Sequence, residues 1–199
     1  MIWRVRRVLT GHDADGKSTI IADGLAPNMK EMPSFPGLAL TDLWETTSAP
    51  ADNEGHGDAA ARPIRLEPPP GGSIFRIVEF PPDSSRPRDA DGAAGFKAIG
   101  AAHAQDRHSS DPMMHKTSTI DYIIVLKGQI YAVLEKGETL LRPGDVFVQR
   151  GTNHSWSVRG SEPCVIAVVL VSAKPVGAGK KKAAARKPAA KSKKAKKKK

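Results

Sequence analysis

Short apolar segments separated by tight turns fill the sequence from about residue 120 to residue 172, and this pattern restricts the fold more than any other feature. The segments are rich in Val and Ile, and turns such as Lys127-Gly128 and Arg142-Pro143-Gly144 interrupt them every few residues. Strands are expected at Ile120–Leu126, Gln129–Leu134, Thr139–Leu141, Asp145–Gln149, His154–Val158 and Cys164–Val171. Closely spaced short strands predict an all-β meander that closes into a barrel.

Further strand candidates precede this meander. Trp3–Leu9 and Ser18–Ala22 flank a Gly- and Asp-rich loop, so they are expected to form an N-terminal β-hairpin extension. Gly37–Glu45 is another candidate, and its Trp44 is expected in the core. In Ser73–Phe80, alternation places Arg76 on an otherwise apolar face.

Residues 81–111 lack the periodicity of either strand or helix. A loop of this length inside a compact domain is usually functional or disordered. We expect a flexible surface loop, with a lid over a site as the alternative, and we expect His103 and His108 within it to be solvated.

Basic charge is concentrated at the C-terminus. The whole chain has a net charge of +10, yet residues 174–199 alone contain 13 Lys or Arg and no Asp or Glu. Residues 1–173 therefore carry 18 basic and 21 acidic side chains and are mildly acidic. We predict one domain over residues 1–173, whose motif-bearing barrel core spans about 72–172, followed by a disordered Lys/Ala-rich tail over 174–199.

A run of Lys and Arg of this density would neutralise several phosphates and bind DNA or RNA without sequence preference. An anionic membrane surface and a purely solubilising role are the alternatives. The basic residues expected to contact nucleic acid are Lys180, Lys181, Lys182, Arg186, Lys187, Lys191, Lys193, Lys194, Lys196 and Lys197.

Nothing in the sequence indicates secretion or membrane insertion. The first residues are charged but are not followed by an apolar signal region, and no stretch reaches the roughly 18–20 apolar residues of a membrane span. Cys164 is the single cysteine and lies in an apolar run, so we expect a buried free thiol. A cytoplasmic location without a membrane span is expected.

Two motifs carry a resemblance to a known family. In the first, His115-Lys116-Thr117 precedes Asp121 and then the turn glycine Gly128; in the second, Pro143-Gly144-Asp145 precedes Gly151-Thr152-Asn153-His154. Both resemble the motifs of the cupin superfamily, in particular small bacterial cupins and the cupin-domain oxidoreductases of fungal biosynthetic clusters. Thr117 stands where the first motif has a second His, and Gln149 stands where the second has Pro.

The resemblance implies a double-stranded β-helix, that is, a jelly-roll barrel, and a homodimer. It also implies a divalent metal held by His115, Asp121 and His154, with Fe(II) first and Zn, Mn or Ni as alternatives. On a continuous strand His115, Thr117 and Asp121 would share one face, and two His with one carboxylate are typical of non-haem Fe(II) sites. Without the metal, the histidines could be satisfied polar residues at strand ends.

Several other residues are candidates for the pocket. A buried Arg76 needs a partner, for which Glu79, Asp121 or an anionic substrate are the choices, unless it reaches solvent at the barrel rim. Asp121 and Arg76 are the expected catalytic residues. Substrate contacts are expected from Arg76, Thr117, Tyr122, Gln149 and Trp156, although the two aromatic residues and the glutamine also fit simple packing.

These expectations support one function and two alternatives. The first is a metal-dependent, oxidoreductase-like enzyme acting on a small organic substrate. A cupin that binds a small ligand without turning it over is the second, for which Thr117 at a ligand position is the best argument. The third is a cupin module tethered to nucleic acid by its basic tail.

Overall fold

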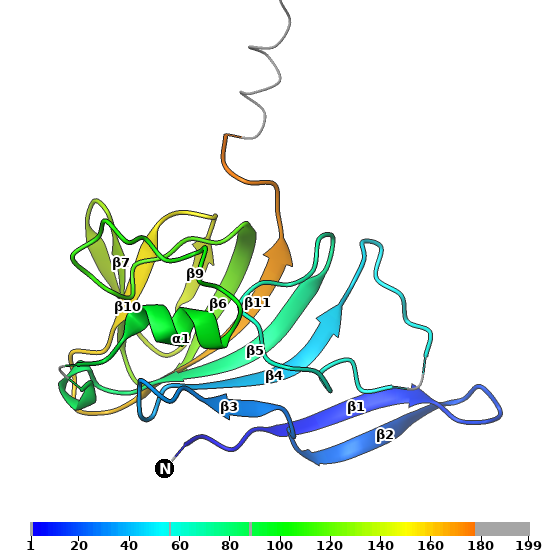
Figure 1. The fold of residues 1–199 in the computed structure, drawn as a ribbon. Helices are drawn as coiled ribbons and strands as arrows, with labels where there is room; N and C mark the ends of the chain where they lie inside the picture. The colour runs from blue at the N-terminus through cyan, green and yellow to red at the C-terminus, as the bar shows by residue number, and fades with distance from the viewer. Residues whose placement is uncertain (1, 56, 88, 178–199) are drawn as a thin grey trace, which may run out of the picture.

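The computed structural model describes residues 2–55, 57–87 and 89–177 (Figure 1). Within these residues no helix is long and apolar enough to cross a membrane. The predicted contacts of the tail from Lys180 onward lie outside the described residues.

In chain order the elements are β1 (Arg6–His12), β2 (Ser18–Leu25), β3 (Met29–Glu31), β4 (Ala39–Thr46), β5 (Ser73–Phe80), a 3-10 turn (Asp83–Ser85), α1 (Gly92–Ala98), β6 (Thr119–Lys127), β7 (Ile130–Leu134), β8 (Glu138–Leu141), β9 (Val146–Gln149), β10 (His154–Ser157) and β11 (Cys164–Ser172).

Two antiparallel sheets build the barrel. The larger has the strand order β3-β4-β5-β11-β6-β9, and the smaller has the order β10-β7-β8. The predicted all-β, double-stranded β-helix architecture is confirmed, and each of the six expected meander strands lies within one residue of its predicted ends. The N-terminal hairpin is confirmed as well, since β1 and β2 form a separate two-stranded sheet that extends beyond the barrel in Figure 1.

The core lies between the inner faces of the two sheets. Alternation along β6 turns Ile123 and Val125 inward, where they pack with Ile74 of β5 and Ile130 of β7. All four side chains are almost completely buried. Each contributes about 1.5–3 kcal/mol relative to an exposed side chain, so this interdigitation holds the sheets together.

The outer face of the larger sheet is apolar but largely uncovered. Trp44, Phe75, Tyr122 and Val148 are all exposed there. The expectation that Trp44 lies in the core is wrong, because the register irregularity between Asp42 and Trp44 turns the indole outward. Val5 of the N-terminal segment packs against a second small apolar cluster, which covers part of this face.

Residues 81–111 are more ordered than expected. Asp91 caps α1 by accepting a hydrogen bond from the Ala94 amide at 3.0 Å, and Phe96 on this helix is buried in the core. Behind the helix, the Leu66 amide donates to the Ile99 carbonyl at 3.0 Å. The expectation of a surface segment without regular structure is therefore wrong for Gly92–Ala98. A seven-residue helix is too short for its periodicity to be recognised in the sequence.

The turn between β6 and β7 explains the glycine of the first motif. Gly128 has a φ of 72°, and a Cβ at this position would lie 2.3 Å from the Pro163 carbonyl oxygen. Only glycine fits both the left-handed conformation and the close approach of this neighbouring backbone.

Candidate functional site

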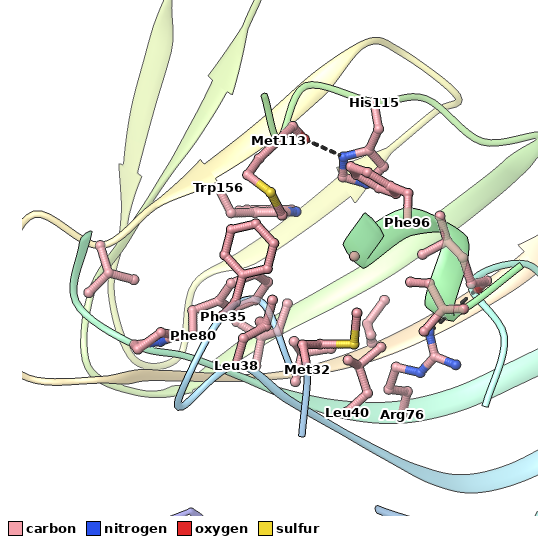
Figure 2. A pocket seen from close by; sticks show the side chains of 18 of the residues that line it. Met32, Phe35, Leu38, Leu40, Arg76, Phe80, Phe96, Met113, His115 and Trp156 are labelled. Atoms are coloured by element: carbon pink, nitrogen blue, oxygen red, sulfur yellow. Dashed lines mark hydrogen bonds between the residues drawn. The ribbon is translucent and has the colours of Figure 1, made fainter. Parts of the chain in front are cut away.

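A cavity of about 150 Å³ lies inside the barrel, between the two sheets and α1. Most of its wall is apolar. Figure 2 shows Phe35, Phe80, Met113 and Trp156 gathered on one side, His115 beside Phe96, and Arg76 toward the opposite side. Of the residues predicted from the sequence, the cavity is lined by Arg76, His115, Thr117, Asp121, His154 and Trp156.

The two motif histidines are brought together by their own backbones. His115 precedes β6, and its amide donates to the His154 carbonyl while the His154 amide donates back to the His115 carbonyl, both at 2.9 Å. The imidazole centroids are 4.3 Å apart. The shared pocket predicted for His115 and His154 therefore exists, although a bridge rather than a continuous strand places His115 in it.

Backbone carbonyls fix the tautomer of both rings. His115 Nδ1 lies 2.8 Å from the Met113 carbonyl oxygen, and His154 Nδ1 lies 3.0 Å from that of Thr152. A carbonyl oxygen can only accept, so each Nδ1 carries the proton and each Nε2 keeps its lone pair. Within the described residues neither Nε2 has a hydrogen-bond partner, which leaves two acceptors for a bound molecule.

Burial keeps both rings neutral. Burial and, to a smaller extent, the neighbouring His115 together lower the pKa of His154 to about 3, against the opposing effect of the Thr152 carbonyl. Burial also lowers the pKa of His115, while the Met113 carbonyl and the Asp111 carboxylate oppose the shift. At neutral pH the site therefore presents two imidazoles and no imidazolium.

Polar side chains behind the histidines hold the loops that carry them. Asp111 accepts hydrogen bonds from the Ser155 hydroxyl at 2.5 Å and from the Met113 amide at 2.8 Å. Gln149 donates to the Thr152 carbonyl at 3.0 Å. The carbonyls that receive the imidazole protons are thus themselves positioned. Gln149 is buried outside the cavity wall, so the expectation that it orients the substrate is corrected to this supporting contact.

Asp121 contributes a buried carboxyl with one unpaired oxygen to the cavity wall. Its side chain is buried, and its Oδ1 has no hydrogen-bond partner in the described part of the chain. Burial raises the pKa of this carboxyl to about 6, opposed by the Thr119 hydroxyl and the Arg76 charge and reinforced by Glu67. A carboxyl whose pKa lies this close to neutrality can both give and take a proton.

Thr117 and Trp156 also line the cavity, whereas Tyr122 does not. The Thr117 hydroxyl is 2.6 Å from that of Thr119, and the indole of Trp156 packs edge-on against His154 at 5.7 Å. Tyr122 follows the inward-facing Asp121 on β6, so its ring points outward and is half exposed. The prediction of a substrate contact for Tyr122 is therefore wrong.

Arg76 is buried, and its partner is one that the sequence reading missed. Its Nε and Nη2 donate to the two carboxylate oxygens of Asp42 at 2.5 and 3.1 Å, and Nη2 also donates to the Arg65 carbonyl at 2.5 Å. Neither Glu79 nor Asp121 forms an ion pair with it within the described residues. One signal could have revealed the pair: Asp42 lies in the middle of the strand candidate Gly37–Glu45, just as Arg76 lies in the middle of Ser73–Phe80. Two opposite charges in the middle of two apolar strands suggest an ion pair between them.

The ion pair belongs to a larger network behind the cavity. Arg62 pairs with Asp42 at 2.9 Å and with Glu45, which also pairs with Arg65. Asp42 is fully buried. Removing one partner of such a buried ion pair would leave an uncompensated charge, so this cluster is a fixed part of the wall.

The donor set does not fit the metal site expected from the resemblance. Among residues 2–55, 57–87 and 89–177, no three side chains of His, Cys, Asp or Glu come together as a metal site would require. His115 and His154 are adjacent, but Asp121 does not complete a set with them. The predicted His115, Asp121 and His154 triad is therefore not assembled here, and Thr117 adds only a neutral hydroxyl.

Comparison with known proteins agrees with the motifs. The family described as Cupin domain matches residues 103–171. "Phomopsin biosynthesis cluster protein C'" of Diaporthe leptostromiformis is 33% identical over 180 residues, covering 85% of this chain and 79% of that protein. "Cupin-domain-containing oxidoreductase virC" of Hypocrea virens is 27% identical over 181 residues, covering 87% and 78%. The solved cupin domain of Schizosaccharomyces pombe Cnp3 is 12% identical with a TM-score of 0.42, covering 85% and 89%.

The match to the Diaporthe protein, at 33% identity, covers 85% of this chain. Together with the barrel and the paired histidines, it establishes that this chain belongs to the cupin superfamily and is related to fungal cupin-domain-containing oxidoreductases and biosynthesis cluster proteins.

Proposed function

We propose that this cupin is an oxidoreductase-like enzyme that binds a small, mainly apolar organic molecule in the barrel cavity and transfers a proton at the molecule's polar group. One observation carries the proposal: two neutral imidazoles with free Nε2 atoms and the unpaired Asp121 Oδ1 belong to the wall of a mainly apolar cavity. A concave apolar pocket with a few convergent polar groups is the usual form of a small-molecule site. The relatives named oxidoreductases support this reaction class.

Each polar residue has a defined part in this proposal. His154 and His115 accept a hydrogen bond from the bound molecule at Nε2, and Asp121 exchanges the proton because its pKa of about 6 is matched to neutral pH. Trp156 and Phe96 pack against the apolar part and exclude water. Such a proton transfer is sufficient for isomerisation or elimination of a hydroxyl compound. In an oxidation it is one part of the step, and a soluble two-electron acceptor must take up the electrons.

A divalent metal has no role in this proposal. The resemblance implied one, but the described donor set lacks the third ligand, and the carboxyl expected to supply it is better explained as a proton carrier. The metal-dependent oxidoreductase expected from the sequence is thereby replaced by a metal-independent proton step.

A cupin that binds a ligand without reaction is the second candidate. It is favoured by Thr117, whose hydroxyl takes the place of a motif imidazole and is hydrogen bonded to Thr119. With a threonine at this position, the cavity keeps its shape but lacks the second imidazole of the first motif.

Turnover measurements separate these functions. The full-length protein is incubated with hydroxylated single-ring compounds, with and without EDTA, and products are followed by proton NMR. We expect turnover that EDTA does not affect and that Asp121→Asn or His154→Ala lowers by about 10²–10⁴-fold. His108→Ala, which removes an exposed imidazole outside the cavity, should leave the rate unchanged.

The other outcomes are equally informative. Binding without turnover would establish the ligand-binding candidate. Loss of turnover on chelation would contradict the metal-independent step. If no compound binds in the cavity, both candidates are wrong.

A further inference from the structure

The charges around the cavity determine which molecules it can accept. Arg76 lines the cavity, but most of its guanidinium donors are already engaged by protein acceptors. Two of its nitrogens bind Asp42, a third contact goes to the Arg65 carbonyl, and its Nη1 lies 3.5 Å from the Leu66 carbonyl. Four of its five N–H donors are therefore engaged, and the Asp42 carboxylate in contact with the guanidinium offsets most of the charge that a ligand carboxylate would otherwise meet.

The second arginine of the cavity wall is paired as well. Arg86 contacts Asp83 at 3.3 Å, and its guanidinium lies 5.9 Å from the centroid of the Phe35 ring. Asp83 also accepts a hydrogen bond from the Ser157 hydroxyl at 2.6 Å. The charge of Arg86 is therefore also offset by a carboxylate beside it.

Most of the polar groups that remain free are acceptors, and the Trp156 indole N–H is an uncharged donor in the same wall. Each Nε2 of His115 and His154 offers a lone pair, and Asp121 Oδ1 has no partner among the described residues. Whether protonated or not, the Asp121 carboxyl brings no positive charge. A carboxylate entering here would place its own lone pairs against these acceptors and would lose its hydration without gaining a counter-ion.

We infer that the cavity selects uncharged ligands that carry a hydroxyl or another hydrogen-bond donor and excludes carboxylates, and that Asp42 is the residue that determines this selectivity by neutralising Arg76. The inference rests on the proposed function in one respect, that the cavity is where the substrate binds. It corrects the expectation that Arg76 holds an anionic substrate.

The size of the cavity narrows the choice of probe. A dry apolar cavity of about 150 Å³ accommodates a benzene ring. Benzyl alcohol and benzoate have one ring each and nearly the same shape, but the first presents a hydroxyl donor and the second a full negative charge. Comparing the affinities of the two compounds therefore measures the effect of ligand charge at nearly constant ligand size.

Affinities of both probes for the full-length protein are measured by NMR titration at about pH 8, where benzoate is ionised, with the imidazole and indole resonances reporting the site. We expect benzyl alcohol to bind at least about 100-fold more tightly than benzoate, as unpaired burial of a carboxylate requires. Equal affinities would overturn the inference and leave the proposed function standing. Failure of both probes to bind would refute the proposed site itself.

Variants locate the origin of the selectivity. Asp42→Asn should raise benzoate affinity by at least about 10-fold, because Arg76 then has a free charge. Glu45→Gln alters the same ionic network without touching Arg76 or the cavity, and it should change nothing. If Asp42→Asn does not fold, Asp121→Asn serves instead, since removing the carboxylate of the cavity should lower the preference for benzyl alcohol. An unchanged preference in the folded variants would refute the assignment to these groups.

Discussion

Asp121 should make the protein less stable as the pH rises from about 4 to about 6. Its pKa is raised from the model-compound value of 3.8 to about 6 because the carboxyl is buried, so the folded protein keeps a proton that the unfolded chain releases. Stability therefore falls across this window and is constant above it. A shift of about two pKa units corresponds to about 3 kcal/mol.

Asp121→Asn tests this value directly. The amide cannot ionise, so the variant should gain about 3 kcal/mol relative to the wild type on going from about pH 4 to about pH 8. Comparing the two pH values cancels the pH-independent cost of burying an amide in place of a carboxyl. The free energy of unfolding is measured by urea denaturation at both pH values, with equal denaturant dependence as a check on two-state behaviour.

Asp58 provides a control in which the stability should change with pH in the opposite direction. The hydrogen bond from Arg7 lowers the pKa of Asp58, so Asp58→Asn should lose more stability at the higher pH. If the stability difference between Asp121→Asn and wild type is the same at both pH values, Asp121 is not a buried, unpaired carboxyl in the folded protein.

Three further predictions follow from features away from Asp121. Phe96→Ala should lower the free energy of unfolding by about 3–5 kcal/mol in urea denaturation, because the ring anchors α1 in the core; a change below 1 kcal/mol would contradict that anchor. Burial raises the pKa of Cys164 to about 12, so the native thiol should be inert to Ellman's reagent at neutral pH and react only on unfolding; prompt native labelling would contradict this. Full-length protein should bind DNA with a steep salt dependence that a 1–173 truncation lacks, as measured by fluorescence anisotropy; equal binding by both would exclude the tail.

The barrel could be predicted because its determinants are local. The strand pattern from Ile120 onward is set by alternation and by turn residues that are adjacent in sequence, such as the glycine at position 128. The second His motif could be recognised for the same reason, because Gly151 and His154 lie within one turn and the strand that follows it. His154 then contacts His115 through a single pairing of their two backbone segments.

The rest of the site could not be predicted because it depends on contacts between distant segments. Arg76 demanded a partner, but Asp42 lies on a strand whose pairing register is shifted by an irregularity that the sequence does not reveal. Phe96 enters the cavity from a helix too short to be recognised. Tyr122 and Asp121 are neighbours in sequence, and only the exact phase of β6 decides which faces inward.

The position of β11 has a consequence for folding. This strand lies at the centre of the larger sheet, where it pairs with β5 on one side and with β6 on the other, so it joins an N-terminal half to a C-terminal half. Arg76 belongs to the first half and Asp121, His115 and His154 to the second. The cavity therefore forms only when the last strand enters the sheet. Because these pairings link residues far apart in sequence, folding should be slow, and a ligand of the cavity would bind only to chains that have completed it.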